Sequence, residues 1–197
     1  MKILLVGGST SVDHLDLRAD YPGWTVCQLN VNWQRRPQQP VHWLFFRRSS
    51  GLELSEVPQY CKIFAQGPRT IYPSIDQYLI FECFIDGRYI NTNPYKPCYE
   101  WCNVLGKRLK TSPLIGILAI TRILMEPALA QLKVIGFDFY GGDKIEVGGH
   151  YLPTQKAYLK ELAEVDARLV LEPELEELLG VDRFSRFATF EIPACKT

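Results

Sequence analysis

The sequence has no excess of charge of either sign. Its 197 residues include 22 basic and 22 acidic side chains, so the formal net charge is zero. Nucleic-acid-binding domains usually carry a basic face, and an acidic excess is typical of solvated interaction tails. We therefore expect no nucleic-acid partner. The hydrophobic share of 47% is ordinary for a globular domain with a substantial core.

Long apolar runs are missing as well. No stretch reaches the roughly 18 consecutive apolar residues that a membrane-spanning helix requires. The opening MKILLVGGST has only five apolar side chains before a glycine pair, too few for the core of a signal peptide. We expect a cytoplasmic protein without an integral membrane segment. Peripheral attachment at the inner membrane face is compatible with this sequence.

Residues that bind metals are scarce. The chain has three histidines, and it has no Asp-x-Asp motif or compact carboxylate cluster of the type that holds a divalent ion. Its six cysteines are scattered through apolar stretches, which is typical of reduced, packed thiols. Cys98 and Cys102 could share a helix face, but a zinc site would need two further ligands. The sequence therefore predicts no metal site.

The apolar residues that are present form short β-branched runs and longer helical patterns. This alternation predicts an α/β fold, with a Rossmann-like, mostly parallel sheet and helices on both faces, in a single domain spanning residues 1–197. Thr154 is the expected N-cap of one helix, and Gly180 the expected end of another. The predicted strands are Lys2–Val6, Trp24–Leu29, Val41–Phe46, Tyr60–Ala65, Leu132–Ile135 and Ala167–Leu171, and the predicted helices lie between Pro113 and Pro127, at Thr154–Val165 and at Pro173–Leu179.

Two segments fit this pattern less well. Between residues 71 and 106, aromatic residues alternate with Pro, Asn and Gly, as on a sugar-binding surface or in half-buried loop anchors. The length of this segment suggests a loop or helical lid within 71–106. The tail at residues 183–192 alternates like an edge strand, so it could dock on the domain or pair two copies in a homo-oligomer.

Polar or small residues follow the first three predicted strands. Gly7, Gly8, Ser9 and Thr10 form a turn that lets backbone N–H groups approach a phosphate or nucleotide. Arg47 could bind a phosphate or carboxylate, although adjacent arginines more often form a solvated strand end. The turn lacks the full G-x-G-x-x-G spacing and an acidic ribose partner, which disfavours a dinucleotide-dependent oxidoreductase.

The stretch from Pro113 to Tyr151 carries the strongest signal. It contains a P-x-x-G opening that ends at Gly116, an apolar helix, a strand that ends in G-F-D-F-Y with Asp138 and Tyr140, and then His150-Tyr151. This ordered set resembles the small-motif region of the sialyltransferases. It is similar both to the animal-type enzymes and, more closely, to the bacterial family that ends this strand in G-x-D-F-Y.

The resemblance implies a GT-A-type variant of the Rossmann-like fold and an inverting, metal-independent transfer. The donor would be CMP-sialic acid or a related CMP-sugar, and the acceptor a hydroxyl of a surface glycan or lipo-oligosaccharide. No cofactor is implied besides the CMP-sugar, which is a substrate. The residues implied by the resemblance and the turn chemistry are His150 and Tyr140 as catalytic, and Gly7, Gly8, Ser9, Thr10, Asn30, Arg47, Gly116, Asp138 and Tyr151 as donor-binding.

Particular roles follow for some of these residues. Tyr140 would donate to the leaving phosphate, and Asn30 would touch the donor nucleotide unless it only closes a turn. His150 is the best candidate for the general base, since His42 lies in an apolar run and is predicted to be packed, and His14 is predicted on a surface helix. Asp138 more readily ties the loop through backbone N–H groups. Tyr151 or Lys144 would replace a second phosphate tyrosine of the bacterial family.

The chain also departs from the families it resembles. The bacterial enzymes carry an asparagine where this chain has Gly8, so the contact is lost or supplied by the backbone, Ser9 or Thr10. Leu114 and Ile115 stand where the animal-type enzymes have Ser-Thr, and a second histidine after the H-Y pair is missing. These departures leave open a rival hypothesis, a catalytically inactive nucleotide-binding or partner-binding domain of the same fold.

Overall fold

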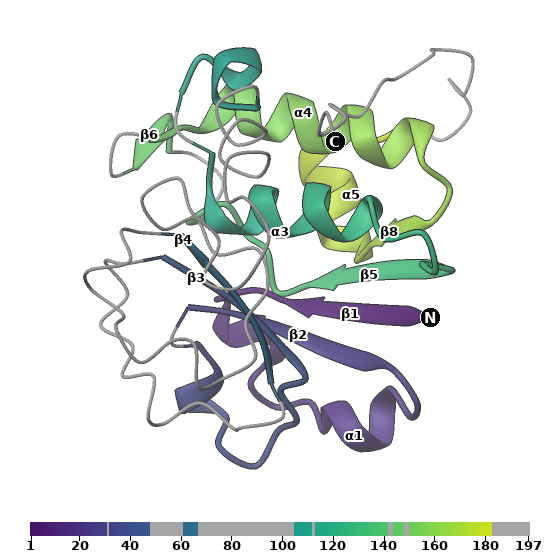
Figure 1. Cartoon of the computed structure of the whole chain (residues 1–197). Helices are drawn as coiled ribbons and strands as arrows, with labels where there is room; N and C mark the ends of the chain where they lie inside the picture. Colours follow the sequence, from purple (N-terminus) through teal and green to yellow (C-terminus); the bar gives the residue numbers. More distant parts are fainter. Residues whose placement is uncertain are drawn as a thin grey trace.

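The computed structural model describes residues 1–30, 32–47, 61–66, 105–111, 113–141, 144–147 and 150–182. Within them, six parallel strands form one sheet in the order β4-β3-β2-β1-β5-β8 (Figure 1). This arrangement confirms the predicted α/β, Rossmann-like fold. The strands are β1 (Lys2–Val6), β2 (Thr25–Leu29), β3 (Trp43–Arg47), β4 (Lys62–Gln66), β5 (Gln131–Ile135) and β8 (Leu169–Leu171), and a separate antiparallel pair consists of β6 (Glu146–Val147) and β7 (His150–Tyr151).

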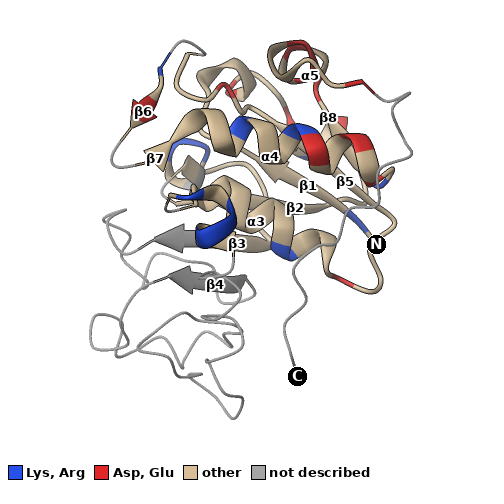
Figure 2. Ribbon diagram, turned by 90° about the horizontal axis from the view of Figure 1, so that it is seen from above, with Lys and Arg blue, Asp and Glu red and all other residues tan. Residues whose placement is uncertain are grey.

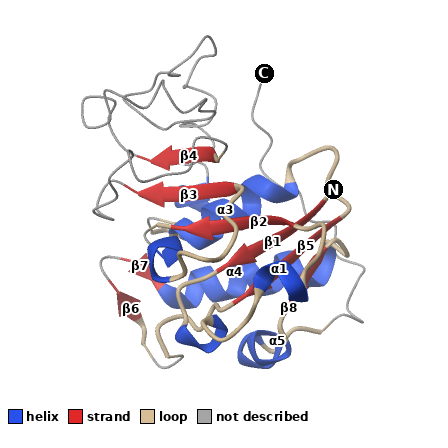
Figure 3. Cartoon of the chain, turned by 90° about the horizontal axis from the view of Figure 1, so that it is seen from below, coloured by secondary structure: helices blue, strands red, loops and turns tan. Residues whose placement is uncertain are grey.

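Helices cover both faces of the sheet (Figures 1 and 3). Ile3 and Leu5 of β1 pack in the cluster that also contains the helices α3, α4 and α5, whereas Leu4 and Val6 pack on the opposite face. All four side chains are fully buried, which explains why β1 reads as a continuous apolar run rather than an alternating one. The helices on the first face are α3 (Ile115–Leu124), α4 (Leu152–Val165) and α5 (Pro173–Leu179), and the opposite face is covered by the 3-10 turn η1 (Thr10–Val12) and the short α1 (Leu17–Asp20).

The helix α3 lies between the two prolines that the sequence predicted as its limits. Eight of its ten residues are buried, including the glycine near its start. Thr121 is the polar exception, and its hydroxyl donates to the Ile117 carbonyl at 2.8 Å, so burial leaves no unpaired donor. The helix therefore serves as a core element whose first turn is directed to one end of the sheet.

The start of α4 differs from the prediction. The helix begins at Leu152, so Pro153 lies inside the first turn, and Thr154 is not its N-cap. The Thr154 hydroxyl instead donates to the Tyr151 carbonyl at 3.1 Å. A proline is tolerated at this position because the first helical N–H groups have no partner within the helix. The predicted end of the next helix is correct: Gly180 follows the last residue of α5 and adopts φ 61°, in the left-handed region.

Charge is not sorted strongly over the described elements. In Figure 2 the ribbon of α5 is coloured for acidic residues, whereas that of α4 carries residues of both signs.

No helix in the part of the chain that the structure describes is long and apolar enough to cross a membrane. The predicted lid, apart from residues 105–106, and the tail at 183–192 lie outside the described residues.

Two of the six cysteines are described, and both are buried free thiols. Cys27 lies in β2, and Cys61 lies directly before β4. Burial raises the pKa of Cys61 to about 12 and raises that of Cys27 as well. Both thiols therefore stay protonated and act as small apolar core groups.

The prediction that His42 is packed in a strand is wrong. The strand β3 starts at Trp43, the residue after His42, and His42 is exposed directly before the strand. Its Nδ1 accepts the Val26 N–H at 2.9 Å, and its own N–H donates to the Val26 carbonyl. His14 is also not on a helix, because it lies exposed in the turn after η1.

We expect His42 to make folding stability fall in mild acid. The His42 side chain reaches solvent but is partly covered at the strand entrance, and this partial desolvation, followed by repulsion from Arg18, lowers the pKa of His42 below its ordinary value of 6.5. The unfolded chain therefore binds a proton first, and stability is lost as pH falls from about 6.5 toward the lower folded pKa. Urea unfolding at pH 7.5 and at pH 5.5 measures this loss. His42→Asn, which keeps an acceptor near Val26 and cannot titrate, should show a smaller loss; equal losses would contradict the assignment.

Candidate active site

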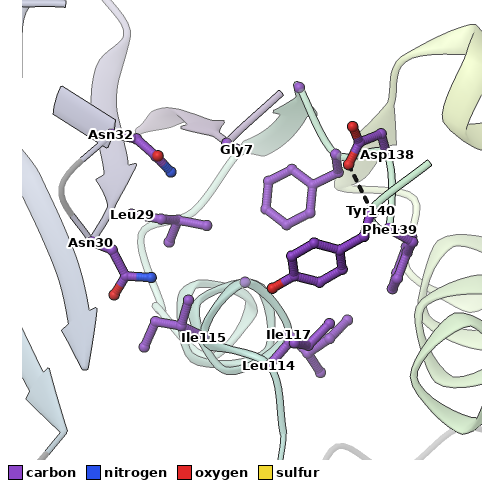
Figure 4. Close-up of a pocket in the computed structure, with 14 residues that line it drawn as sticks. Gly7, Leu29, Asn30, Asn32, Leu114, Ile115, Ile117, Asp138, Phe139 and Tyr140 are labelled. Atoms are coloured by element: carbon purple, nitrogen blue, oxygen red, sulfur yellow. Dashed lines mark hydrogen bonds between the residues drawn. The ribbon is translucent and has the colours of Figure 1, made fainter. Parts of the chain in front are cut away.

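The order in which the chain adds strands reverses between β1 and β5. From β1 the chain adds β2, β3 and β4 on one side, and it then returns to add β5 and β8 on the other side. Open α/β sheets bind ligands outside the carboxyl ends of the strands at this switch point. A cavity of about 380 Å³ lies there. It is lined by the turns that follow β1, β2 and β5 and by the first turn of α3 (Figure 4). Most of the predicted donor-binding segments therefore meet at one place.

Two turns pack back to back at the base of this cavity. The Gly7 N–H donates to the Ile135 carbonyl at 2.8 Å, and the Ser9 N–H donates to the Gly136 carbonyl at 3.0 Å. A Cβ on Gly7 would lie 2.2 Å from the Gly136 oxygen and 2.6 Å from Phe137 Cδ2. Gly7 is required for this close approach of two backbones, not for an unusual φ.

Two arginines hold the glycine turn from outside the cavity. Arg36 is 5% exposed, and its guanidinium donates to the carbonyl oxygens of Gly7 at 3.3 Å and Ser9 at 3.1 Å. Arg35 donates to the Gly8 carbonyl at 2.9 Å. Asp13 pairs with Arg36 at 2.7 Å and balances the buried charge. Three successive carbonyls are thus fixed by side chains that do not line the cavity.

This arginine pair was not singled out from the sequence, where it lies in the polar, proline-containing segment QRRPQQP. Adjacent arginines after the second strand and an aspartate after the glycine turn were the available signal. The signal was weak because nothing in the sequence states that the two loops touch. Arg47, which the sequence singled out instead, ends β3, and its side chain lies outside the described part.

Two asparagines enter the cavity from the end of β2. Asn30 adopts φ 47°, a left-handed conformation that asparagine tolerates, and its N–H donates to the Phe45 carbonyl at 2.7 Å. Asn32 begins the 3-10 helix η2 (Asn32–Arg35) and lies beside Gly8. Ser9 and Thr10 do not line the cavity, and the Ser9 hydroxyl accepts the Ser11 N–H instead. The amide near Gly8 therefore comes from Asn32 and not from the residues that the sequence suggested.

The first turn of α3 is the opposite wall. Leu114 occupies the N-cap position and provides no side-chain cap, although its own N–H donates to Gln155 Oε1 at 2.9 Å. Leu114, Ile115 and Gly116 all line the cavity. A Cβ on Gly116 would lie 2.3 Å from Phe137 Cε1, so this glycine lets the helix pack closely against the turn after β5. The uncapped amide end of the helix thus faces the cavity.

The turn after β5 closes the site. Asp138 Oδ1 accepts the Tyr140 N–H at 2.9 Å, the loop-tying role that the sequence suggested for it. Phe139 and Tyr140 adopt φ 47° and 61°, which costs free energy for bulky residues and is most common at functional sites. Tyr140 is 49% exposed, and its ring extends over the α3 turn with its hydroxyl toward the cavity (Figure 4).

A carboxylate supports this turn from behind. Glu172 Oε1 accepts the Gly136 N–H at 2.9 Å. Burial raises the pKa of Glu172, and the N–H groups it accepts from Gly136 and Phe137 only partly offset that effect. Glu172 was not predicted from the sequence, in which it reads as an ordinary residue before a helix.

His150 and Tyr151 lie on β7, apart from the residues that line the cavity. His150 is 9% exposed, Tyr151 is 44% exposed, and the Tyr151 N–H donates to the Thr111 hydroxyl at 3.1 Å. Lys144, the other predicted substitute, is exposed and also lies outside the lining. The cavity therefore brings together Gly7, Gly8, Asn30, Gly116, Asp138 and Tyr140, and it does not include Ser9, Thr10, His150 or Tyr151.

Comparisons with protein-family models, with curated proteins and with solved structures find no match to this chain. The described residues contain no group of three His, Cys, Asp or Glu side chains placed to hold a metal ion. Metal independence remains a prediction, as do the donor and the reaction.

Proposed function

We propose that the cavity binds the nucleotide of a CMP-sugar and that the chain is an inverting, metal-independent glycosyltransferase that transfers sialic acid or a related acidic sugar. The observation that carries this proposal is the uncapped amide end of α3, which faces the glycine turn of β1 across the switch point. The motif resemblance to the sialyltransferases supplies the identity of the sugar and of the reaction.

The charge of the cavity favours one phosphate group. The ten-residue helix α3 directs its partial positive charge toward the site, and an anion there would satisfy amide groups that no side chain caps. The described lining residues include no Lys or Arg, and the one carboxylate among them, Asp138, already accepts the Tyr140 N–H. A nucleoside monophosphate leaving group carries less charge than a diphosphate, and neutral donors such as amides and hydroxyls can stabilise it.

The chemistry follows from this placement. The acceptor hydroxyl attacks the anomeric carbon of the sugar from the side opposite CMP, and the bond between that carbon and the phosphate oxygen breaks. The phosphate keeps the electron pair, while the Tyr140 hydroxyl donates a hydrogen bond to it. His150 takes the proton from the acceptor. Configuration at the anomeric carbon is inverted.

One set of observations favours the rival, a nucleotide-binding domain without catalysis. His150 does not line the cavity, and the first turn of α3 presents the apolar Leu114 and Ile115. The two functions are separated by incubating the protein with CMP-Neu5Ac, with and without a lactose-type acceptor, and by following CMP release. Release that depends on the acceptor supports the transferase. Binding of CMP without any release in either incubation supports the rival.

We expect CMP to stabilise the fold and NAD to leave it unchanged. A ligand at one hundred times its dissociation constant adds about 2.7 kcal/mol, or about 5 to 10 °C of melting temperature for a chain of this size. The glycine turn does not have the spacing that a dinucleotide pyrophosphate requires. Differential scanning fluorimetry with each ligand measures the effect. A shift with NAD and none with CMP would overturn the donor assignment.

A further inference from the structure

Asn32 is a polar side chain in the cavity that the fold itself does not use. No hydrogen bond joins its amide to another residue in the described part of the chain, although it lies beside Gly8 and projects toward the site (Figure 4). We propose that Asn32 is a specificity-determining residue that bonds directly to the bound nucleotide. This inference rests on the proposed function of the cavity.

The geometry around Gly8 shows why a glycine lies next to the Asn32 amide. A Cβ on Gly8 would lie 3.2 Å from Asn32 Nδ2, 3.6 Å from Oδ1 and 3.7 Å from Cγ. Gly8 is not among the glycines with positive φ, so its backbone does not require glycine. The absent side chain instead leaves room for the Asn32 amide beside the glycine turn, because a Cβ at 3.2 Å would force that amide to shift by a few tenths of an ångström.

The neighbouring asparagine differs in its use. Asn30 lies in the left-handed region, and its N–H is bonded to the Phe45 carbonyl, so it shapes the turn between β2 and η2. Asn32 follows that turn as the first residue of η2 and carries no such constraint. Its position therefore depends on the turn, while its hydrogen-bonding groups remain available to a ligand.

A primary amide has one acceptor oxygen and a donor NH₂ group. It therefore matches a ligand group that presents a donor next to an acceptor, as the edge of the cytosine ring does. Apart from Asn30, this side of the cavity offers mainly backbone and apolar groups. We expect Asn32 to contribute affinity for CMP and to be replaceable only by another amide at the same point.

Isothermal titration calorimetry with CMP tests this inference. Asn32→Ala should weaken CMP binding about tenfold or more, the effect of one hydrogen bond lost to a bound ligand. The melting temperature without ligand should stay within about 2 °C of wild type, since the amide has no partner in the fold. Gln34→Ala, on the same 3-10 helix and outside the cavity, is the matched control and should bind CMP like wild type.

Exchanging the two residues gives the decisive comparison. Gly8→Asn adds a side chain that crowds the Asn32 amide, so alone it should weaken binding, and Asn32→Gly alone removes that amide and should also weaken binding. The double variant Gly8→Asn/Asn32→Gly relieves the crowding and provides one amide from the glycine turn, so it should bind within about threefold of wild type, a strongly non-additive result.

The outcomes are distinguishable. If wild type binds CMP and Asn32→Ala binds it equally well, the inference is overturned while the proposed function stands. A weak Asn32→Ala whose loss the double variant does not restore also overturns it, because the amide then acts only by packing. Wild type that binds no CMP overturns the proposed function and this inference together.

Discussion

Replacing His150 by alanine is expected to lower sugar transfer by about two to four orders of magnitude, because it removes the base that takes the acceptor proton. The affinity for CMP should stay nearly unchanged. The structural reason is the position of His150 on β7, outside the lining of the cavity proposed for the nucleotide. Transfer is measured by acceptor-dependent CMP release, and affinity by calorimetry on the same preparation.

Tyr140→Phe is the matched comparison, since it deletes a hydroxyl that faces the cavity and keeps the ring. It should lower transfer, and it should weaken CMP binding by roughly 1 to 3 kcal/mol if the hydroxyl meets a charged oxygen.

Full transfer activity in His150→Ala would exclude this histidine as the base. Neither other histidine lines the cavity: His42 caps the entrance of β3, and His14 lies in the turn after η1. If His150→Ala instead loses CMP binding together with transfer, the histidine has a structural role in β7 and the base is another group.

Gly7→Ala is expected to disrupt the fold around the site. The new Cβ would lie 2.2 Å from the Gly136 carbonyl oxygen, and this contact is between the backbones that directly follow β1 and β5, which the pairing of these two strands holds in place. We expect a loss of about 3 kcal/mol or more in the free energy of unfolding, with a melting temperature lower by about 6 to 12 °C. CMP binding should be lost as well.

Gly8→Ala is the matched control for this substitution. Its Cβ would meet only the end of a side chain, Asn32 Nδ2 at 3.2 Å, which can move by a few tenths of an ångström. The expected change is below about 1 kcal/mol. Guanidinium unfolding of both variants makes the comparison, and equal stability of Gly7→Ala and wild type would show that the two turns are not packed as described.

The sequence by itself determined the elements whose signals are local. The strand β1 was predicted with its observed limits, because a compact apolar run that ends in two glycines is consistent with a buried strand and little else. The helix α5 was predicted from Pro173 to Leu179, because proline at its start and glycine after its end both act within one turn. Apolar spacing and the flanking prolines likewise located α3.

Boundaries failed where a local signal was ambiguous. Thr154 looked like a helix cap because threonine often is one, yet the helix α4 begins earlier and includes Pro153 in its first turn. His42 looked buried because its neighbours are apolar, but its side chain turns back to the Val26 N–H of the adjacent strand. In both cases the side chain makes a hydrogen bond that the local sequence does not predict: the Thr154 hydroxyl donates to the Tyr151 carbonyl, and His42 Nδ1 accepts the Val26 N–H.

The composition of the site was decided only by the tertiary structure. Gly7 and Gly136 are 129 positions apart in the numbering, and they meet because β1 and β5 are neighbours in the sheet. The pairing of β1 with β2 likewise brings Asn32 beside Gly8 and Arg36 to the glycine turn. His150 lies on a separate antiparallel pair, β6 and β7. Such contacts depend on which strands pair and how closely two backbones approach, and neither quantity is encoded in the local pattern of residues from which a sequence is read.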